Sequence, residues 1–145
     1  MSEGFDELKL DNQICFPLYA VSKEIIRRYK PFLEKIDLTY TQYITMMVMW
    51  EAESICVKDL GKRLFLDSGT LTPVLKTLEK KGYITRARSS EDERVLNVKI
   101  TKEGMNLRAM AADVPLQVGK CVALEQDDAV QLYRILHKLM DQFAE

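Results

Sequence analysis

Cysteine and histidine are scarce in this 145-residue chain, and their scarcity excludes several kinds of site. The three cysteines, Cys15, Cys56 and Cys121, are an odd number with wide spacing, which fits neither a disulfide framework nor a zinc site. The single histidine, His137, leaves little from which to build a His-rich metal site or a local Ser-His or Cys-His pair. We therefore expect no metal and no cofactor, and in a reducing compartment we expect any cysteine with a role to be reactive rather than structural.

Long apolar runs are also missing, and we expect no signal peptide. No run approaches the roughly eighteen apolar residues needed to span a bilayer, and the first fifteen residues carry acidic side chains throughout, unlike a signal peptide. We expect a cytoplasmic protein with no membrane partner. The length and an apolar content of 47% suit one domain, residues 1–145, with a sizeable core, which argues against a multidomain enzyme.

The chain also lacks an excess of either charge. Its 21 basic and 22 acidic residues give a net charge of −1, an average that argues against a polyanionic partner. However, residues 58–102 hold 11 basic and 6 acidic residues, a net charge of +5, whereas the segments before and after each carry −3. One basic segment therefore lies between two acidic arms, which keeps nucleic acid open as a partner.

Apolar periodicity predicts a mainly α fold with one small β-hairpin. A long amphipathic helix is expected over residues 10–33, and Pro17 should mark its regular start or a kink. A buried helix should follow Thr39, which can form a capping box with Gln42. Four residues of this second helix are expected in the core: Met46, Met47, Met49 and Trp50.

The centre of the chain predicts two further helices and a hairpin. A short helix over 57–64 precedes one that Asp67 or Ser68 can cap and that Gly82 can close. Apolar residues then alternate around Ile84 and over 96–100, with a charged hairpin tip between them. Helical periodicity returns over 101–119, where Pro115 should bend or break the helix, and in a last helix that carries His137 at the surface or in an interface.

Residues 55–100 thus form a winged helix-turn-helix pattern, in which the second helix enters the major groove and the hairpin reaches an adjacent groove. Arg94 at the hairpin tip suits a narrow minor groove. The candidate DNA contacts are short hydroxyl and basic side chains with one proline: Ser68, Thr70, Thr72, Pro73, Lys76, Arg86, Arg88, Arg94 and Lys99. A solvated charged surface and a simple helix cap are the alternative interpretation of the same residues.

Segment 58–104, which contains LFLDSGTLTPVLKTLEKKGYITR and SSEDERVLNVKITKEG, resembles the MarR family of dimeric winged-helix transcription regulators. The run LDNQICFPLYA at residues 10–20 narrows the resemblance to the organic-hydroperoxide-sensing, OhrR-like branch. The resemblance implies that Asp92 holds Arg94 at the wing tip and that helices within 10–36 and 101–145 form a homodimer. The wide apolar faces of these helices favour a dimer independently, and a dimer would place two recognition helices roughly 34 Å apart.

The resemblance also assigns the cysteines. A peroxide sensor must be a thiolate, which the positive end of a helix favours, whereas a free cysteine is more usually a small buried hydrophobe. The resemblance implies that Cys15 is the sensor, hydrogen-bonded by Tyr29 and Tyr40 across the dimer, with Tyr19 as a third candidate. Cys56 matches no sensor motif and is expected to be structural.

The position of Cys121 resembles that of the resolving cysteine in two-cysteine members of the family. If it belongs to that subtype, the sulfenic acid of Cys15 would condense with Cys121 of the partner chain. The alternatives are a small thiol that caps Cys15 and a Cys121 that is buried and inert.

These patterns together predict a redox-sensing repressor rather than an enzyme. The reduced homodimer would bind a pseudo-palindromic double-stranded DNA operator and leave it when an organic hydroperoxide or related oxidant oxidises Cys15. Three alternatives remain: a MarR-type regulator controlled by a small phenolic ligand, a thiol peroxidase that uses Cys15, and a winged-helix protein-interaction module. A peroxidase would not explain the basic hairpin.

Overall fold

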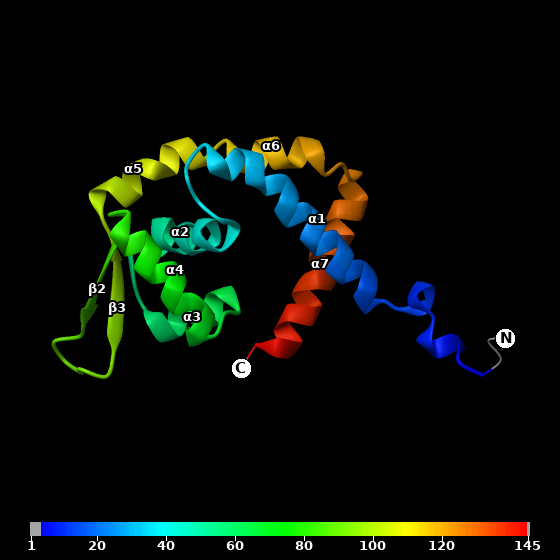
Figure 1. Cartoon of the computed structure of the whole chain (residues 1–145), viewed down its shortest axis with the longest axis horizontal. Coiled ribbons are helices and arrows are strands. Elements are labelled where there is room, and N and C mark those ends of the chain that lie inside the picture. The colour runs from blue at the N-terminus through cyan, green and yellow to red at the C-terminus, as the bar shows by residue number, and fades with distance from the viewer. Residues whose placement is uncertain (1–3, 145) are drawn as a thin grey trace.

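The computed structural model describes residues 4–144 and confirms a mainly helical fold with a small β-sheet. Figure 1 shows α2, α3, α4 and the sheet gathered into one lobe, from which α1, α6 and α7 extend as arms. In chain order the elements are η1 (Asp6–Leu8), η2 (Leu10–Asn12), α1 (Cys15–Glu34), α2 (Tyr40–Ala52), β1 (Ser54–Cys56), α3 (Val57–Leu64), α4 (Ser68–Lys80), β2 (Ile84–Arg88), β3 (Leu96–Ile100), α5 (Lys102–Ala111), α6 (Val114–Cys121) and α7 (Gln126–Phe143).

The first long helix begins later than its periodicity predicted. Two single 3₁₀ turns occupy residues 6–12, where the Asn12 side chain donates to the Asp6 carbonyl at 2.7 Å. The α-helix starts at Cys15, so Pro17 lies in its first turn. A backbone N–H in the first turn has no acceptor within the helix, so proline loses no hydrogen bond there. The expected start at residue 10 was therefore wrong, whereas the start just before Pro17 is confirmed.

Two helix ends form as the sequence predicted. Thr39 and Gln42 make a reciprocal capping box at the start of α2, with the Gln42 backbone N–H donating to Thr39 Oγ1 at 3.3 Å. At the end of α4, Gly82 has φ +85° and donates its backbone N–H to the Glu79 carbonyl at 2.9 Å. The capping box therefore fixes where α2 begins, and Gly82 fixes where α4 ends.

The sheet has three antiparallel strands in the order β1-β3-β2. The predicted hairpin pairs Ile84 with Ile100 and Arg88 with Leu96. The outer strand β1 was not predicted, because three residues between two helices show no alternation to detect. It places Ser54 opposite Lys99 and leads directly into α3.

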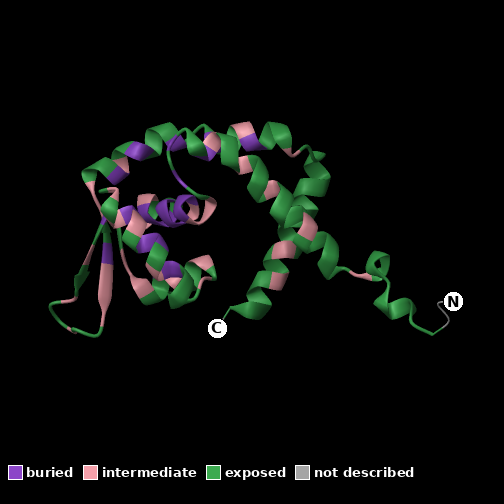
Figure 2. Ribbon diagram, in the orientation of Figure 1, coloured by how far each residue is buried: buried purple, intermediate pink, exposed green. Residues whose placement is uncertain are grey.

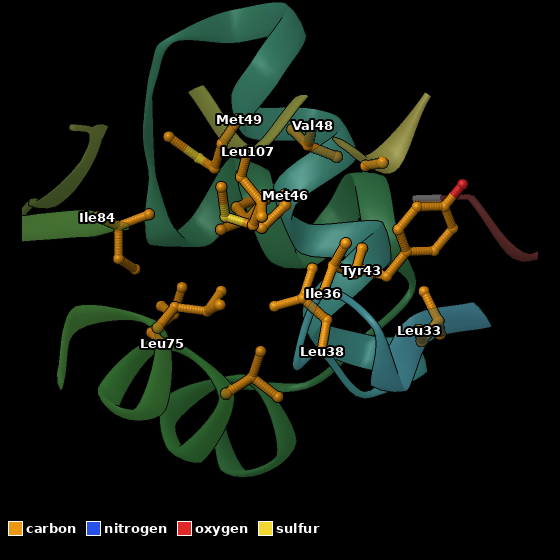
Figure 3. Packing of buried hydrophobic residues seen from close by; sticks show 14 of the residues in the cluster. Leu33, Ile36, Leu38, Tyr43, Met46, Val48, Met49, Leu75, Ile84 and Leu107 are labelled. Atoms are coloured by element: carbon orange, nitrogen blue, oxygen red, sulfur yellow. The ribbon is translucent and has the colours of Figure 1, made fainter. Parts of the chain in front are cut away.

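The core lies inside the lobe, where Figure 2 shows the buried residues gathered. Met46 and Met49 of α2 are fully buried there with side chains from α4, β2 and α5 (Figure 3). Trp50 is half-buried against the same cluster and donates its ring N–H to the Gly104 carbonyl at 2.8 Å. Met47 points away from the core and is 44% exposed, so its expected burial was wrong.

The arms bury little within one chain. Pro115 falls at the start of α6, and α5 ends at Ala111, which confirms the predicted break. α6 packs along α1 and buries Val114 and Val118, whereas no described residue of α7 is buried. Exposed apolar side chains on α1 and α7 are Phe16, Leu18, Tyr19, Val21, Ile26, Val130, Leu132, Tyr133, Ile135, Met140 and Phe143. Wide apolar faces therefore remain uncovered on both arms.

Candidate functional site

The amino-terminal half of α4 presents the short polar side chains that the sequence singled out. The Asp67 carboxylate accepts the Thr70 backbone N–H at 2.7 Å, and this hydrogen bond holds the pKa of Asp67 below its ordinary value. Leu71, Val74, Leu75 and Leu78 bury one face of the helix. The opposite face leaves four predicted contacts exposed, namely Ser68, Thr70, Pro73 and Lys76, with Thr72 half-buried and its hydroxyl donating to the Ser68 carbonyl.

At the tip of the β2–β3 hairpin, an arginine side chain is held by two hydrogen bonds to one carboxylate. Arg94 Nε donates to Asp92 Oδ1 at 3.1 Å, and its Nη2 donates to Asp92 Oδ2 at 3.2 Å. These side-chain hydrogen bonds, with a further one from the Arg94 backbone N–H, hold the pKa of Asp92 below its usual range. The Arg94 side chain is 91% exposed, so it is oriented by Asp92 while it remains accessible.

Arg86, a predicted DNA contact, is paired with an acidic residue of α4. Its guanidinium lies 3.1 Å from Glu79 Oε1 of α4, and its backbone N–H donates to Glu79 Oε2 at 2.9 Å. The Arg86 hydrogen bonds lower the pKa of Glu79, and the Arg86 side chain is only 20% exposed. Arg86 therefore fastens β2 to α4, whereas Arg88 is exposed further along the strand.

A groove of about 750 Å³ between α3 and the hairpin contains basic residues that sequence reasoning missed. Lys58 and Lys62 line it from α3, Arg88 and Arg94 line it from the hairpin, and Phe143 of α7 lines it as well. Its apolar lining comes from Val57, Phe65, Leu66, Leu71, Val95 and Leu96. The signal was present in the sequence, because residues 58 and 62 are four apart and share one helix face.

Three tyrosines cluster where α1 meets α2. The ring centroids of Tyr29 and Tyr40 are 5.0 Å apart, and Tyr43 packs against both. Burial raises the pKa of Tyr29 and Tyr40, and burial with the neighbouring tyrosines raises that of Tyr43 to about 12. The hydroxyls are therefore protonated near neutral pH and are able to donate hydrogen bonds to an anion.

The structure does not bring these tyrosines to Cys15 of the same chain. Cys15 is exposed as the first residue of α1, with the exposed Tyr19 one turn further on. Tyr29 is fourteen residues along the same helix, about 21 Å away at 1.5 Å per residue. A contact between the Cys15 thiol and Tyr29 therefore requires a second chain.

Cys121 is exposed at the end of α6 within one chain. The Cys121 carbonyl accepts a hydrogen bond from Arg28 Nη1 of α1 at 3.3 Å. Arg28 lies thirteen residues after Cys15 in α1, so Cys121 is far from Cys15 of the same chain. Cys56 is half-buried in β1, and all three thiols are free. His137 is exposed on α7, with its ring stacked on that of Tyr133.

Within residues 4–144, no three His, Cys, Asp or Glu side chains gather as a metal site would require. No helix in the same part of the chain is both long and apolar enough to cross a membrane.

Residues 27–109 of the chain match the family described as transcriptional regulator SarA/Rot. The chain belongs to the SarA/Rot family of transcriptional regulators. This SarA/Rot-family protein is 44% identical over 141 residues to the organic hydroperoxide resistance transcriptional regulator of Bacillus subtilis, covering 97% of this chain and 96% of that one. It is 45% identical over 135 residues to the HTH-type transcriptional regulator SarZ of Staphylococcus haemolyticus, with 92% of each chain covered.

Among solved structures, the SarA/Rot-family chain resembles AbfR of Staphylococcus epidermidis. Reduced AbfR bound to DNA matches with a TM-score of 0.78 at 29% identity, over 96% of this chain and 97% of that one. Disulfide-formed AbfR matches with a TM-score of 0.67, also at 29% identity, over 96% and 95% of the two chains. The predicted MarR-type winged-helix fold is confirmed, and the protein is a transcriptional regulator with regulators rather than enzymes as relatives.

Proposed function

We propose that this regulator is a redox-sensing repressor that binds a pseudo-palindromic operator as a dimer and leaves it when Cys15 is oxidised by an organic hydroperoxide or a related oxidant. One observation carries the proposal: the chain has a complete winged-helix lobe, and it also has an exposed thiol on an arm, whose tyrosine partners are beyond its reach within one chain. Such a thiol would gain its tyrosine hydrogen-bond donors only in a dimer. The oxidation state of the thiol and the arrangement of the two lobes would therefore be linked.

The lobe offers three sets of contacts to double-stranded DNA. The exposed face of α4, with Thr70 and Lys76, suits the edges of bases in the major groove. Lys58 and Lys62 of the groove suit the phosphate backbone beside it. Arg94, held outward by Asp92, suits the adjacent minor groove. The similarity to reduced AbfR bound to DNA supports DNA as the partner.

A second copy of the chain explains the uncovered arms. The apolar faces of α1 and α7 resemble one half of an obligate interface more than the surface of a monomer. In a two-fold dimer of these arms, Cys15 of one chain would meet Tyr29 and Tyr40 of the other. Those two hydroxyls would then stabilise the thiolate by hydrogen bonding.

The chemical step uses this thiolate as a nucleophile. The Cys15 sulfur attacks the terminal peroxide oxygen, the O–O bond breaks, and the departing alkoxide takes a proton from water. The product sulfenic acid then condenses with the thiol of Cys121 from the partner chain and releases water. A disulfide needs its Cα atoms about 4.4 to 6.8 Å apart, so α1 of one chain and α6 of the other would be drawn together and the spacing of the lobes would change.

The decisive experiment measures operator affinity by fluorescence anisotropy before and after one equivalent of an organic hydroperoxide. Wild type should lose affinity, Cys15→Ser should not respond, and Cys56→Ser should behave as wild type. Non-reducing gels should show a cross-linked dimer that is absent in Cys121→Ser. Wild type that keeps its affinity after oxidation would rule out the sensor, and a monomeric band in oxidised wild type would leave a small thiol as the partner of Cys15.

A small phenolic effector is the second candidate, because a cavity of about 450 Å³ lies where the arm meets the lobe. Ile26, Leu33 and Tyr40 line it, together with Arg27 and Lys30. Release from DNA by a phenolic acid, equal in wild type and Cys15→Ser, would favour this function over the redox sensor.

A further inference from the structure

The carboxyl end of α4 is fastened to the turn between α1 and α2 by one lysine. Lys81 Nζ donates to the Asp37 carbonyl and to Gln42 Oε1, the latter at 3.3 Å, and lies 3.4 Å from Asp37 Oδ2. The side chain of Lys81 is only 24% exposed, which is low for a lysine at a helix end. Two of these three acceptor atoms belong to Asp37 in the turn, and the third belongs to Gln42 in the first turn of α2.

The turn is shaped to present these acceptors. Asp37 has φ +53°, a left-handed conformation that is uncommon outside glycine, asparagine and aspartate. Gln42 Oε1 accepts the Thr39 backbone N–H at 3.1 Å as well as the lysine, so the capping box of α2 and the end of α4 share one oxygen. Tyr40 is the first residue of α2, between the two members of that capping box.

α4 is thirteen residues long, which is about 20 Å at 1.5 Å per residue. Lys81 holds one end, and the residues proposed to read DNA begin at the other. A tilt of about 5° around the held end moves the reading end by about 1.7 Å over that length. A displacement of this size is enough to break direct hydrogen bonds to bases.

We propose that Lys81 is a positioning residue that ties the recognition helix to the turn and capping box on either side of Tyr40, and that it transmits the oxidation of Cys15 to the DNA-reading end of α4. The inference rests on the proposed redox function. When the sulfur gains oxygen or a disulfide, the hydrogen bonds from Tyr29 and Tyr40 to the thiolate are lost. Tyr40 shifts with the start of α2, and the acceptors of Lys81 shift with it.

The test compares Lys81→Met with Lys80→Met, which removes the same charge from the same end of α4 at an exposed neighbour. Operator dissociation constants are measured for reduced and oxidised protein, and circular dichroism verifies the fold. Lys81→Met should weaken reduced binding by about tenfold, as expected for the loss of charge-assisted hydrogen bonds. Its oxidised affinity should stay within about twofold of wild type, so the response to oxidant shrinks. Lys81→Arg should restore the response.

Salt dependence separates positioning from DNA contact. Lys81→Met should keep the wild-type slope of log affinity against log salt, whereas a lost phosphate contact lowers the slope by about 0.9. A lowered slope, an unchanged response to oxidant, or an equal effect in Lys80→Met would overturn the inference. If Lys81→Met does not fold, Lys81→Gln is judged by the same measurements. Wild type that keeps its affinity after oxidation would instead overturn the redox function, and the transmission role with it.

Discussion

At the scale of the residue, the wing tip shows how an exposed arginine can be pre-oriented. A guanidinium on a long side chain loses rotamer entropy when it enters a groove. The two hydrogen bonds to Asp92 restrict Arg94 before DNA arrives, so less entropy remains to be lost on binding. The same carboxylate is an acceptor for the Arg94 backbone, which fixes the local turn as well as the side chain.

Replacing Arg94 by alanine should weaken operator binding about tenfold or more, because a specific groove contact is worth about 1 to 3 kcal/mol. Fluorescence anisotropy on a labelled operator measures the change. Arg108→Ala is the matched control, since it removes one exposed arginine from α5, outside the lobe surface proposed to meet DNA. Equal losses in the two variants would show a general charge effect.

The carboxyl group of Asp92 should titrate below its ordinary pKa in the free protein. Its pKa is lowered by Arg94, so the wing ion pair is intact above the ordinary range and is lost as the pH falls through the lowered value. A carbon-detected NMR titration of the Asp92 carboxyl measures this. In Arg94→Ala the pKa should rise back toward its ordinary value, and no difference between the proteins would contradict the pairing in solution.

At the scale of the element, helix ends and the hairpin could be predicted because each depends on a few local residues. Thr39 with Gln42, and Gly82 after α4, carry their own signals. The strand β1 and the ion pair of Arg86 could not be predicted, because both depend on partners distant in the chain or across a turn. The spacing of Lys58 and Lys62 indicates a shared helix face, but the sequence does not show that this face lies beside the hairpin, because the fold brings the two together.

Close approach of α5 to the lobe predicts a strong effect of one methyl group. A Cβ added at Gly104 would lie 2.2 Å from the Tyr83 carbonyl oxygen, so α5 would have to shift and weaken the hydrogen bond from Trp50. Gly104→Ala should lower the free energy of unfolding by about 2 to 4 kcal/mol. Urea denaturation measures it.

Gly119→Ala in α6 is the control for this substitution. An added Cβ at Gly119 meets nothing within 4 Å, so alanine should leave stability unchanged or raise it by up to about 1 kcal/mol. If the two alanine variants were equally stable, the contact between Gly104 and Tyr83 would not be close in solution.

At the scale of the whole molecule, the lobe has its own buried core, whereas the arms leave apolar faces exposed to solvent. The buried residues gather within the lobe and along the α1–α6 contact, whereas α7 leaves its apolar side chains in solvent (Figure 2). In the proposed dimer, a second copy would supply a partner of similar character for this surface.

A charge on the apolar face of α7 should therefore disrupt the assembly. Ile135→Lys should raise the dimer dissociation constant by tenfold or more, because an unpaired charge would be buried at the interface. Sedimentation equilibrium over a range of concentrations measures it. Lys138→Gln, at an exposed polar position on the same helix, should leave the assembly unchanged, and a wild type that sediments as a monomer would contradict the proposed interface.

The distance of about 21 Å between Cys15 and Tyr29 along α1 also has a genetic consequence. Each sensor site of the proposed dimer is the product of two polypeptides, so two inactive alleles can repair each other. A cell carrying one gene with Cys15→Ser and another with Tyr29→Phe and Tyr40→Phe would assemble mixed dimers with one intact thiol site and one doubly defective site. Such a strain should recover part of its peroxide response, whereas two copies of either allele alone should not.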